Sequence, residues 1–199
     1  MPTDALSITP QAGDALLLID VQNDFLPGGS LAVPQGDEIL PLLNRLINSF
    51  ARRGLPIVAT RDWHTAAHCS FHAQGGPWPP HCIAGSHGAA FAAALALPHS
   101  TTIVSKATHA DKDAYSGFDG TDLHATLVGA GIRRLFVGGL ATDYCVLNTV
   151  RDALDKGFAV LLVTDAMRAV DVMPDDGERA LTEMQTLGAT TILSTHVAE

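Results

Sequence analysis

The chain has 199 residues, of which 47% are hydrophobic and 17% charged, so we expect a buried core and not a disordered chain. This length predicts a single domain over residues 1–199. The formal net charge is −9 without a basic cluster, which argues against nucleic acid and anionic membranes as partners. Residues 1–13 lack a secretory-signal pattern, and no apolar run approaches the roughly 20 residues that span a bilayer, so a cytoplasmic location is the default expectation.

Short apolar runs alternate with amphipathic stretches along the chain. Strands are predicted over residues 15–19, 56–60, 101–105, 135–137, 159–164 and 190–193. Helices are predicted from helical apolar spacing in residues 39–50, 123–130, 146–154 and 180–187. Strands that alternate with helices pair in parallel through right-handed crossovers, and continuously apolar strands indicate a sheet covered on both faces. The sequence therefore predicts a three-layer α/β/α fold with a mostly parallel, Rossmann-like sheet of six strands.

Several reactive side chains follow the predicted strands directly. In open α/β sheets, active sites lie beyond the carboxyl ends of the strands. The first three predicted strands end at or just before Asp20, Asp62 and Lys106, and Cys145 follows the fourth. The segment 61–88 has no periodicity and is rich in histidine, and loops of this length are usually functional. We therefore expect an acid, a lysine, a cysteine and a metal-binding loop at one edge of the sheet.

Cysteine chemistry is suggested by three of these residues together. Cys145 is expected in the first turn of a helix, where unpaired N–H groups and the helix dipole favour a thiolate and lower the pKa of the thiol. Asp20 ends an apolar strand and could take the thiol proton, and Lys106 could keep Asp20 ionised. Each also has a structural explanation: a packing cysteine, a carboxylate that binds backbone N–H groups, or a lysine with its head in water. A carboxylate that binds the backbone N–H groups of the turn 22–24 is a strong alternative for Asp24 and a weaker one for Asp20.

The loop offers a set of metal ligands. Asp62 and His64 lie two residues apart, so an extended backbone points both side chains the same way. His81, after the Trp-Pro-Pro stretch, can supply a third ligand. Three protein ligands leave coordination positions open, as in catalytic metal sites. The alternative is a surface loop that happens to be rich in histidine.

The glycine-rich turn 138–142 can aim the backbone N–H groups of Ala141 and Cys145 at a developing oxyanion, or it can simply connect a strand to a helix. The three cysteines of the chain are irregularly spaced, which argues against a disulfide framework.

Taken together, these residues resemble the nicotinamidase branch of the isochorismatase-like cysteine hydrolases, over about residues 15–193. The resemblance is carried by LIDVQNDF at 18–25, PGGSL at 27–31, TRDWH at 60–64, HxSF at 68–71, WPPHC at 78–82, Lys106, YSGF at 115–118 and GLATDYC at 139–145. No single motif is specific, whereas the set is.

The resemblance implies roles for these residues. Cys145 would be the nucleophile, Asp20 the base and Lys106 the third member of the triad. The implied ligands of one divalent metal ion, completed by waters, are Asp62, His64 and His81. Zinc is the first expectation for this ion, with iron or manganese as alternatives. Some family members use a histidine near the position of His68, which is therefore left open as a further ligand.

The resemblance also implies a substrate. In the family the metal meets the pyridine nitrogen of nicotinamide, and Phe25, Trp78 and Tyr115 match the aromatic walls of the ring pocket. The implied reaction converts nicotinamide to nicotinate and ammonia in NAD salvage, with pyrazinamide as a second substrate. A cis peptide between Leu140 and Ala141 is implied as well. The small-molecule substrate is the expected partner, and homo-oligomer formation stays open.

Other functions remain compatible with these residues. A sister amidase acting on a carbamoyl compound or another small amide would keep the Asp-Lys-Cys set without needing the metal. An isochorismatase is disfavoured because vinyl-ether hydrolysis does not need Cys145. A non-enzymatic scaffold on the same fold would be marked by the loss of a triad residue. A structural or storage zinc protein is disfavoured by the open three-ligand set.

Overall fold

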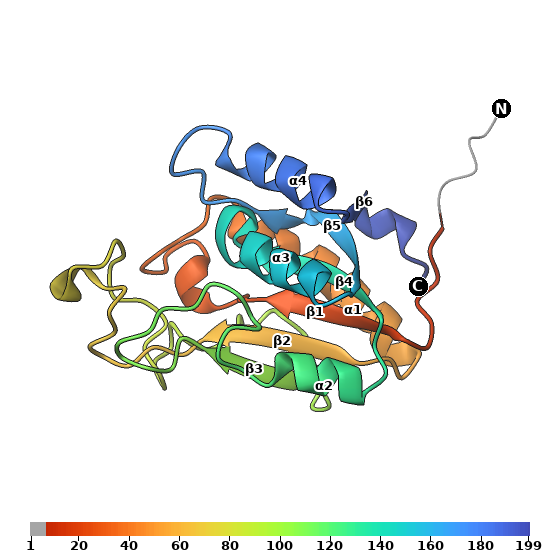
Figure 1. The fold of residues 1–199 in the computed structure, drawn as a ribbon, viewed down its shortest axis with the longest axis horizontal. Coiled ribbons are helices and arrows are strands. Elements are labelled where there is room, and N and C mark those ends of the chain that lie inside the picture. The colour runs from red at the N-terminus through yellow and green to blue at the C-terminus, as the bar shows by residue number, and fades with distance from the viewer. Residues whose placement is uncertain (1–6) are drawn as a thin grey trace.

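The computed structural model describes residues 7–199, so the first six residues of the predicted domain and of segment 1–13 lie outside the described part (Figure 1). The strands are β1 (Asp14–Ile19), β2 (Ile57–Asp62), β3 (Thr102–Lys106), β4 (Arg134–Leu140), β5 (Ala159–Arg168) and β6 (Thr190–Ile192). The α-helices are α1 (Leu40–Arg52), α2 (Leu123–Gly129), α3 (Leu147–Asp155) and α4 (Asp176–Thr186). No helix in residues 7–199 is long and apolar enough to cross a membrane.

The strands form one parallel sheet in the order β3-β2-β1-β4-β5-β6. This confirms the predicted fold class, and the sheet is parallel throughout. The apolar run predicts that the fifth strand ends at residue 164, whereas β5 continues to Arg168. Thr164 and Asp165 are half-buried and interrupt its apolar run, which is why hydrophobicity alone places the end too early.

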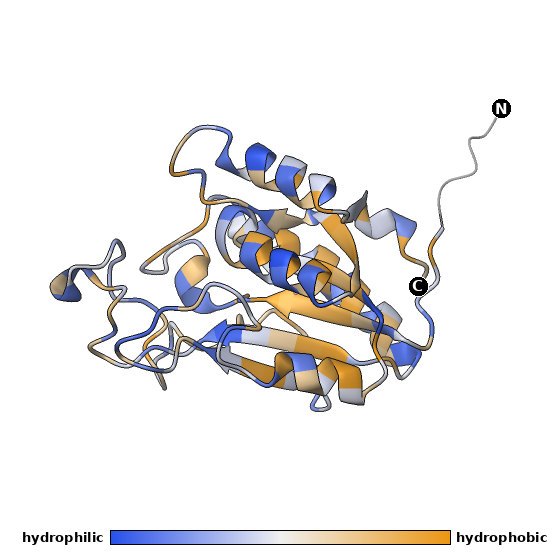
Figure 2. Ribbon diagram, in the orientation of Figure 1, coloured by the Kyte–Doolittle hydropathy of each residue, from blue (hydrophilic) through white to orange (hydrophobic). Residues whose placement is uncertain are grey.

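Helices cover both faces of the sheet and produce two cores. Leu16 and Leu18 of β1 pack in the cluster that includes the apolar side of α1. Their neighbours Ala15, Leu17 and Ile19 pack on the opposite face, with apolar residues of α2, α3 and α4. The apolar strands lie between helices whose outer sides are hydrophilic (Figure 2). All six residues of β1 are buried because each face of the strand has a covering layer.

The topology places a switch point between β1 and β4. From β1 the chain continues to β2 on one side, and from β4 it continues to β5 on the other side. Ligand sites of open α/β sheets form at such a point, outside the carboxyl ends of the strands. The long connection between β2 and β3, residues 63–101, extends from this edge and contains one short 3-10 turn, η3 (His72–Gln74).

Gly139 is required by the close approach of β4 to β1 at this edge. Its φ is +125°, and a Cβ atom at this position would overlap the backbone of Ile19. We expect Gly139→Ala to lower the free energy of unfolding by about 3 kcal/mol or more, through overlap added to backbone strain. Gly157→Ala is the matched control, since its φ is +85° with nothing within 4 Å of the added atom. Urea denaturation measures both, and equal losses would contradict the overlap.

Candidate active site

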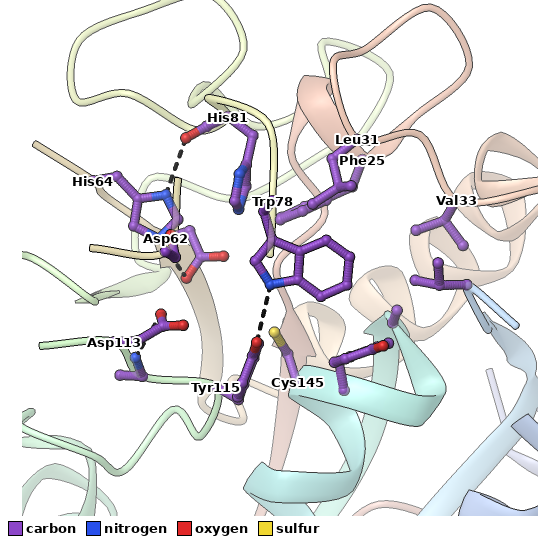
Figure 3. A pocket seen from close by; sticks show the side chains of 15 residues that line it. Phe25, Leu31, Val33, Asp62, His64, Trp78, His81, Asp113, Tyr115 and Cys145 are labelled. Atoms are coloured by element: carbon purple, nitrogen blue, oxygen red, sulfur yellow. Dashed lines mark hydrogen bonds and ion pairs between the residues drawn. The ribbon is translucent and has the colours of Figure 1, made fainter. Parts of the chain in front are cut away.

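A pocket lies at the switch point, and its walls come from segments far apart in the sequence (Figure 3). Predicted site residues that line it are Phe25, Asp62, His64, Trp78, His81, Tyr115, Ala141 and Cys145. Further lining residues that sequence reasoning did not identify are Leu31, Val33, Ser70, Asp113, Ala114, Tyr144 and Val170. Leu31, Ser70 and Tyr144 lie in motifs that carry the resemblance, but no pocket role was expected of them. Val33, Ala114 and Val170 carry no motif signal, because an apolar residue in a loop looks the same in the sequence whether it packs in the core or lines a pocket.

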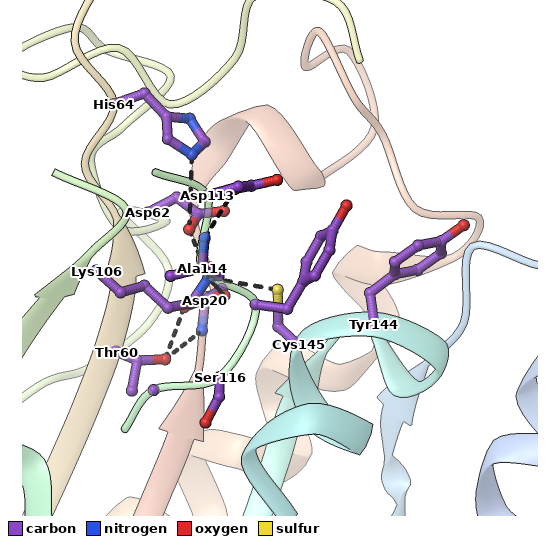
Figure 4. Close-up of polar contacts among 12 residues, drawn as sticks. Asp20, Thr60, Asp62, His64, Lys106, Asp113, Ala114, Ser116, Tyr144 and Cys145 are labelled. Atoms are coloured by element: carbon purple, nitrogen blue, oxygen red, sulfur yellow. Dashed lines mark hydrogen bonds and ion pairs between the residues drawn. The ribbon is translucent and has the colours of Figure 1, made fainter. Parts of the chain in front are cut away.

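Lys106 lies at the centre of the buried polar cluster (Figure 4). Its Nζ lies 3.0 Å from Asp20 Oδ2 and 3.5 Å from Cys145 Sγ. The same ammonium donates to Asp62 Oδ1 at 2.5 Å and to the carbonyl oxygen of Ala114 at 3.0 Å. The structure therefore brings the three predicted triad residues together and links them to one predicted metal ligand.

Asp20 is fully buried and its two carboxylate oxygens differ in environment. Oδ1 accepts a 2.6 Å hydrogen bond from the hydroxyl of Thr60. Oδ2 faces Lys106 as an ion pair but accepts no well-aligned hydrogen bond from the described residues. Burial raises the pKa of Asp20, and the nearby Lys106 ammonium only partly offsets this effect. Asp20 is therefore able to hold a proton as well as to take one.

The pKa of Cys145 corrects one expectation from the sequence. Cys145 lies in a single π-helical turn, η4 (Thr142–Val146), directly before α3. Burial raises the pKa of its thiol well above the ordinary value, although Lys106 acts in the opposite direction. The expectation of a lowered pKa is therefore not met, because desolvation of the thiolate is the largest effect and the carboxylates of Asp20 and Asp62 add to it. The thiol is protonated at rest and needs a base.

The backbone beside Cys145 is arranged around a cis peptide between Leu140 and Ala141, as the resemblance implies. The carbonyl oxygen of Ala141 accepts hydrogen bonds from Tyr144 and Val146. The N–H group of Ala141, by contrast, donates to no acceptor among residues 7–199. This group remains available to a ligand oxygen.

Asp62, His64 and His81 are buried and place their ligand atoms within 4.8 Å of one another. His64 Nδ1 lies 3.0 Å from the carbonyl oxygen of His81, and His81 Nδ1 lies 2.8 Å from that of Pro79. Each Nδ1 is placed to donate its proton to a carbonyl, which leaves Nε2 with a free lone pair. Burial also lowers the pKa of His64, which favours the neutral ring. This donor set fits a divalent metal ion with open coordination positions.

Two further groups of ligand atoms are equally compact. Asp20, Asp62 and Cys145 form one, but the ammonium of Lys106 contacts all three and takes the place of a cation. His64, His68 and Asp113 form the other, which shares His64 with the first set. The ring of His68 stacks on that of His64, and its nitrogens lie 2.7 Å from Ser70 Oγ and 3.2 Å from the carbonyl oxygen of Lys112. His68 thus already has protein partners.

Asp24 anchors the loop that carries the predicted metal ligand His81. Its carboxylate accepts hydrogen bonds from the backbone N–H groups of Cys82, at 2.7 Å, and Ser30, at 3.3 Å. Asp24 thus binds backbone N–H groups, but they belong to Cys82 and Ser30 and not to the turn 22–24 that was expected to supply them. The hydrogen bond from Cys82 fixes the residue that follows His81. It therefore connects the predicted ligand His81 to the turn after β1.

Aromatic side chains form one wall of the pocket. Trp78 Nε1 donates to the hydroxyl of Tyr115 at 2.9 Å. Tyr144, next to the nucleophile candidate in the chain, meets Trp78 edge-on with ring centroids 5.2 Å apart. Phe25 lies against the ring of His81 at 5.7 Å. These rings offer flat apolar surfaces beside the thiol, which suit a planar aromatic ligand.

Known proteins resemble this chain over most of its length. Residues 14–196 match the isochorismatase domain. The nicotinamidase of Escherichia coli (strain K12) is 40% identical over 197 residues, which cover 88% of this chain and 92% of the relative. The pyrazinamidase of Pyrococcus horikoshii in complex with zinc has a TM-score of 0.88 and 49% identity, covering 91% of this chain and 99% of that one. PnC1 from L. infantum in complex with nicotinate has a TM-score of 0.90 and 37% identity, covering 97% and 99%. Because the isochorismatase domain matches residues 14–196 and the relatives cover most of the chain, this protein belongs to the isochorismatase family.

Proposed function

We propose that this protein is a metal-dependent cysteine amidohydrolase that converts nicotinamide to nicotinate and ammonia. The observation that carries the proposal is the contact of Lys106 with Asp20, Cys145 and Asp62 at the base of an aromatic pocket. A nicotinamidase, a zinc-containing pyrazinamidase and a nicotinate-bound protein among the similar proteins support it. The same pocket would accept pyrazinamide, which differs from nicotinamide by one ring nitrogen.

In the first half-reaction, Asp20 takes the proton of the Cys145 thiol, which is protonated at rest because of its raised pKa. The thiolate, 3.5 Å from the ammonium of Lys106, attacks the carboxamide carbon. The N–H groups of Ala141 and Cys145 would receive the negative charge that develops on the amide oxygen. Asp20 then returns the proton to the leaving nitrogen, the C–N bond breaks, and ammonia departs from a thioester on Cys145.

In the second half-reaction, water attacks the thioester and transfers one proton to Asp20. The C–S bond breaks and the proton held by Asp20 returns to the sulfur of Cys145. The second proton of the water passes to solvent, and the product leaves as nicotinate. The raised pKa of Asp20 suits this alternation, since the best proton carrier titrates near the working pH. Phe25, Trp78 and Tyr115 would hold the ring and exclude water from its faces.

The metal would be held by Asp62, His64 and His81, with zinc first and iron or manganese as alternatives. Bound there, it would supply a Lewis acid able to bind a pyridine nitrogen and fix the ring. His68 stays a further candidate ligand. A cytoplasmic location and a single domain over residues 1–199 remain predictions.

Ammonia release from nicotinamide by the purified protein, with its metal retained, tests the function. Release of one ammonia per nicotinate formed is the expected result. No release while one metal ion is confirmed bound would refute the proposal and favour another small amide, such as a carbamoyl compound, as substrate.

Removal of the metal is expected to lower ammonia release by at least about 100-fold, since the ring would lose its fixed orientation. Dialysis against a chelator followed by addition of Zn²⁺ measures the loss and its recovery. His81→Ala should lose tight zinc binding, whereas His87→Ala, an exposed histidine in the same connection, should keep it. Wild-type zinc affinity in the His81→Ala variant would contradict the ligand assignment.

A further inference from the structure

Gln22 is fully buried in the turn after β1, and the proposed reaction does not use it. Its side-chain amide makes three hydrogen bonds. Oε1 accepts from the backbone N–H of Asp62 at 2.8 Å. Nε2 donates to the carbonyl oxygens of Asp62, at 2.8 Å, and Ala89, at 2.9 Å. One side chain therefore binds both backbone groups of a predicted metal ligand.

The sheet leaves the backbone groups of Asp62 without a strand partner on the side of β1. β1 pairs with β2 as far as Leu18 opposite Ala59, and the chain leaves the strand direction at Asp20, whose φ is +48°. Asp62 still pairs with Lys106 of β3 on its other side. A side-chain amide has the same donor and acceptor as a peptide group. Gln22 thus supplies Asp62 with the partner that a continued β1 would have given.

The same turn is fastened to the connection that carries the histidine ligands. The backbone of Gln22 forms a bridge with Phe91, and the N–H of Ala92 donates to the carbonyl oxygen of Val21 at 3.1 Å. Nε2 of Gln22 donates to the carbonyl oxygen of Ala89 in this connection, as well as to that of Asp62 in β2. The side chain therefore joins the connection to β2. Movement of Gln22 would therefore break the hydrogen bonds that hold Asp62 and those that hold the connection between β2 and β3.

A restraint on Asp62 matters because two partners compete for its carboxylate. Oδ1 contacts the ammonium of Lys106 at 2.5 Å and lies 3.8 Å from His64 Nε2. Without a restraint on its backbone, Asp62 could turn its carboxylate towards the permanently charged ammonium of Lys106 and away from His64. We propose that Gln22 is a positioning residue for the metal site, which holds Asp62 in the ligand arrangement before the metal binds. The inference rests on the proposed metal site, not on the identity of the amide substrate.

Zinc titration of metal-free protein, in competition with a chelating dye, tests this role. Gln22→Met keeps the side-chain volume and removes all three hydrogen bonds. We expect its Kd for zinc to rise about 10- to 100-fold, the usual effect of losing the support of a ligand. The matched control is Asn44→Leu, because the amide of Asn44 holds the same connection through Ala94 and Ala96 at 2.8 Å, away from the ligands.

The control should keep the zinc Kd within about twofold, even where urea denaturation shows that both variants are less stable. Wild-type zinc affinity in Gln22→Met, or equal weakening by Asn44→Leu, would overturn the positioning role. If Gln22→Met does not fold, Gln22→Glu replaces it in the titration. Its added carboxylate would by charge alone strengthen cation binding, so weaker binding reports the lost donor, and unchanged or tighter binding overturns the role.

The outcomes also separate this inference from the proposed function. Wild-type protein that binds zinc but releases no ammonia from nicotinamide would refute the reaction, and the titration of the Gln22 variants would still decide the positioning role. Wild-type protein that does not bind zinc would overturn the positioning role regardless of the amidase assay.

Discussion

Replacement of Cys145 by alanine is expected to lower ammonia release from nicotinamide by at least about 10⁴-fold, because no other thiol lies in the pocket to form the thioester. The side chain is buried next to Lys106, so the smaller alanine should leave the fold and the three metal ligands in place. The variant is therefore expected to bind zinc as the wild type does. Steady-state ammonia release and zinc stoichiometry measure the two properties on the same preparation.

Cys69→Ala is the matched control, because Cys69 is a partly exposed free cysteine in the connection between β2 and β3 and does not line the pocket. Its activity should stay within about twofold of wild type. Residual turnover above about 1% in the Cys145→Ala variant would mean that this thiol is not the nucleophile and that water attacks the amide directly.

The second large effect is expected on stability. Lys106→Met should lower the free energy of unfolding of the metal-free protein by about 3–5 kcal/mol, the usual cost of removing one partner from a buried ion pair. Without the ammonium, the buried carboxylates of Asp20 and Asp62 would face each other with no cation between them. Turnover should also fall, since the thiolate of Cys145 would lose its nearby positive charge.

The measurement is urea denaturation in the presence of a chelator, because a bound metal ion would itself compensate the carboxylates. Lys112→Met serves as the control. This lysine is exposed and forms a surface ion pair with Asp119 at 2.6 Å, so its loss should cost no more than about 1 kcal/mol. Equal losses in the two variants would show that the buried cluster gains no stability from Lys106.

The order of strands and helices was predictable because it depends on local hydrophobic periodicity. Residues 15–19 of β1 are all apolar, which the sequence shows directly, and the ends of the strands locate Asp20, Asp62 and Lys106 at one edge. The limit of this reasoning is visible in β5. The half-buried polar residues Thr164 and Asp165 interrupt its apolar run, and only pairing with β4 shows that the strand continues to Arg168.

The sequence by itself determined the α/β class, the family resemblance and the residues that meet at the edge of the sheet, since each depends on residue type and short-range spacing. Only the tertiary structure decided the protonation of Cys145 and the support of Asp62 by Gln22. The first depends on desolvation and on charges from other strands, and the second on a contact across 40 residues. Such contacts leave no pattern in the neighbouring sequence. They form only because β1 stops pairing with β2 before β2 ends.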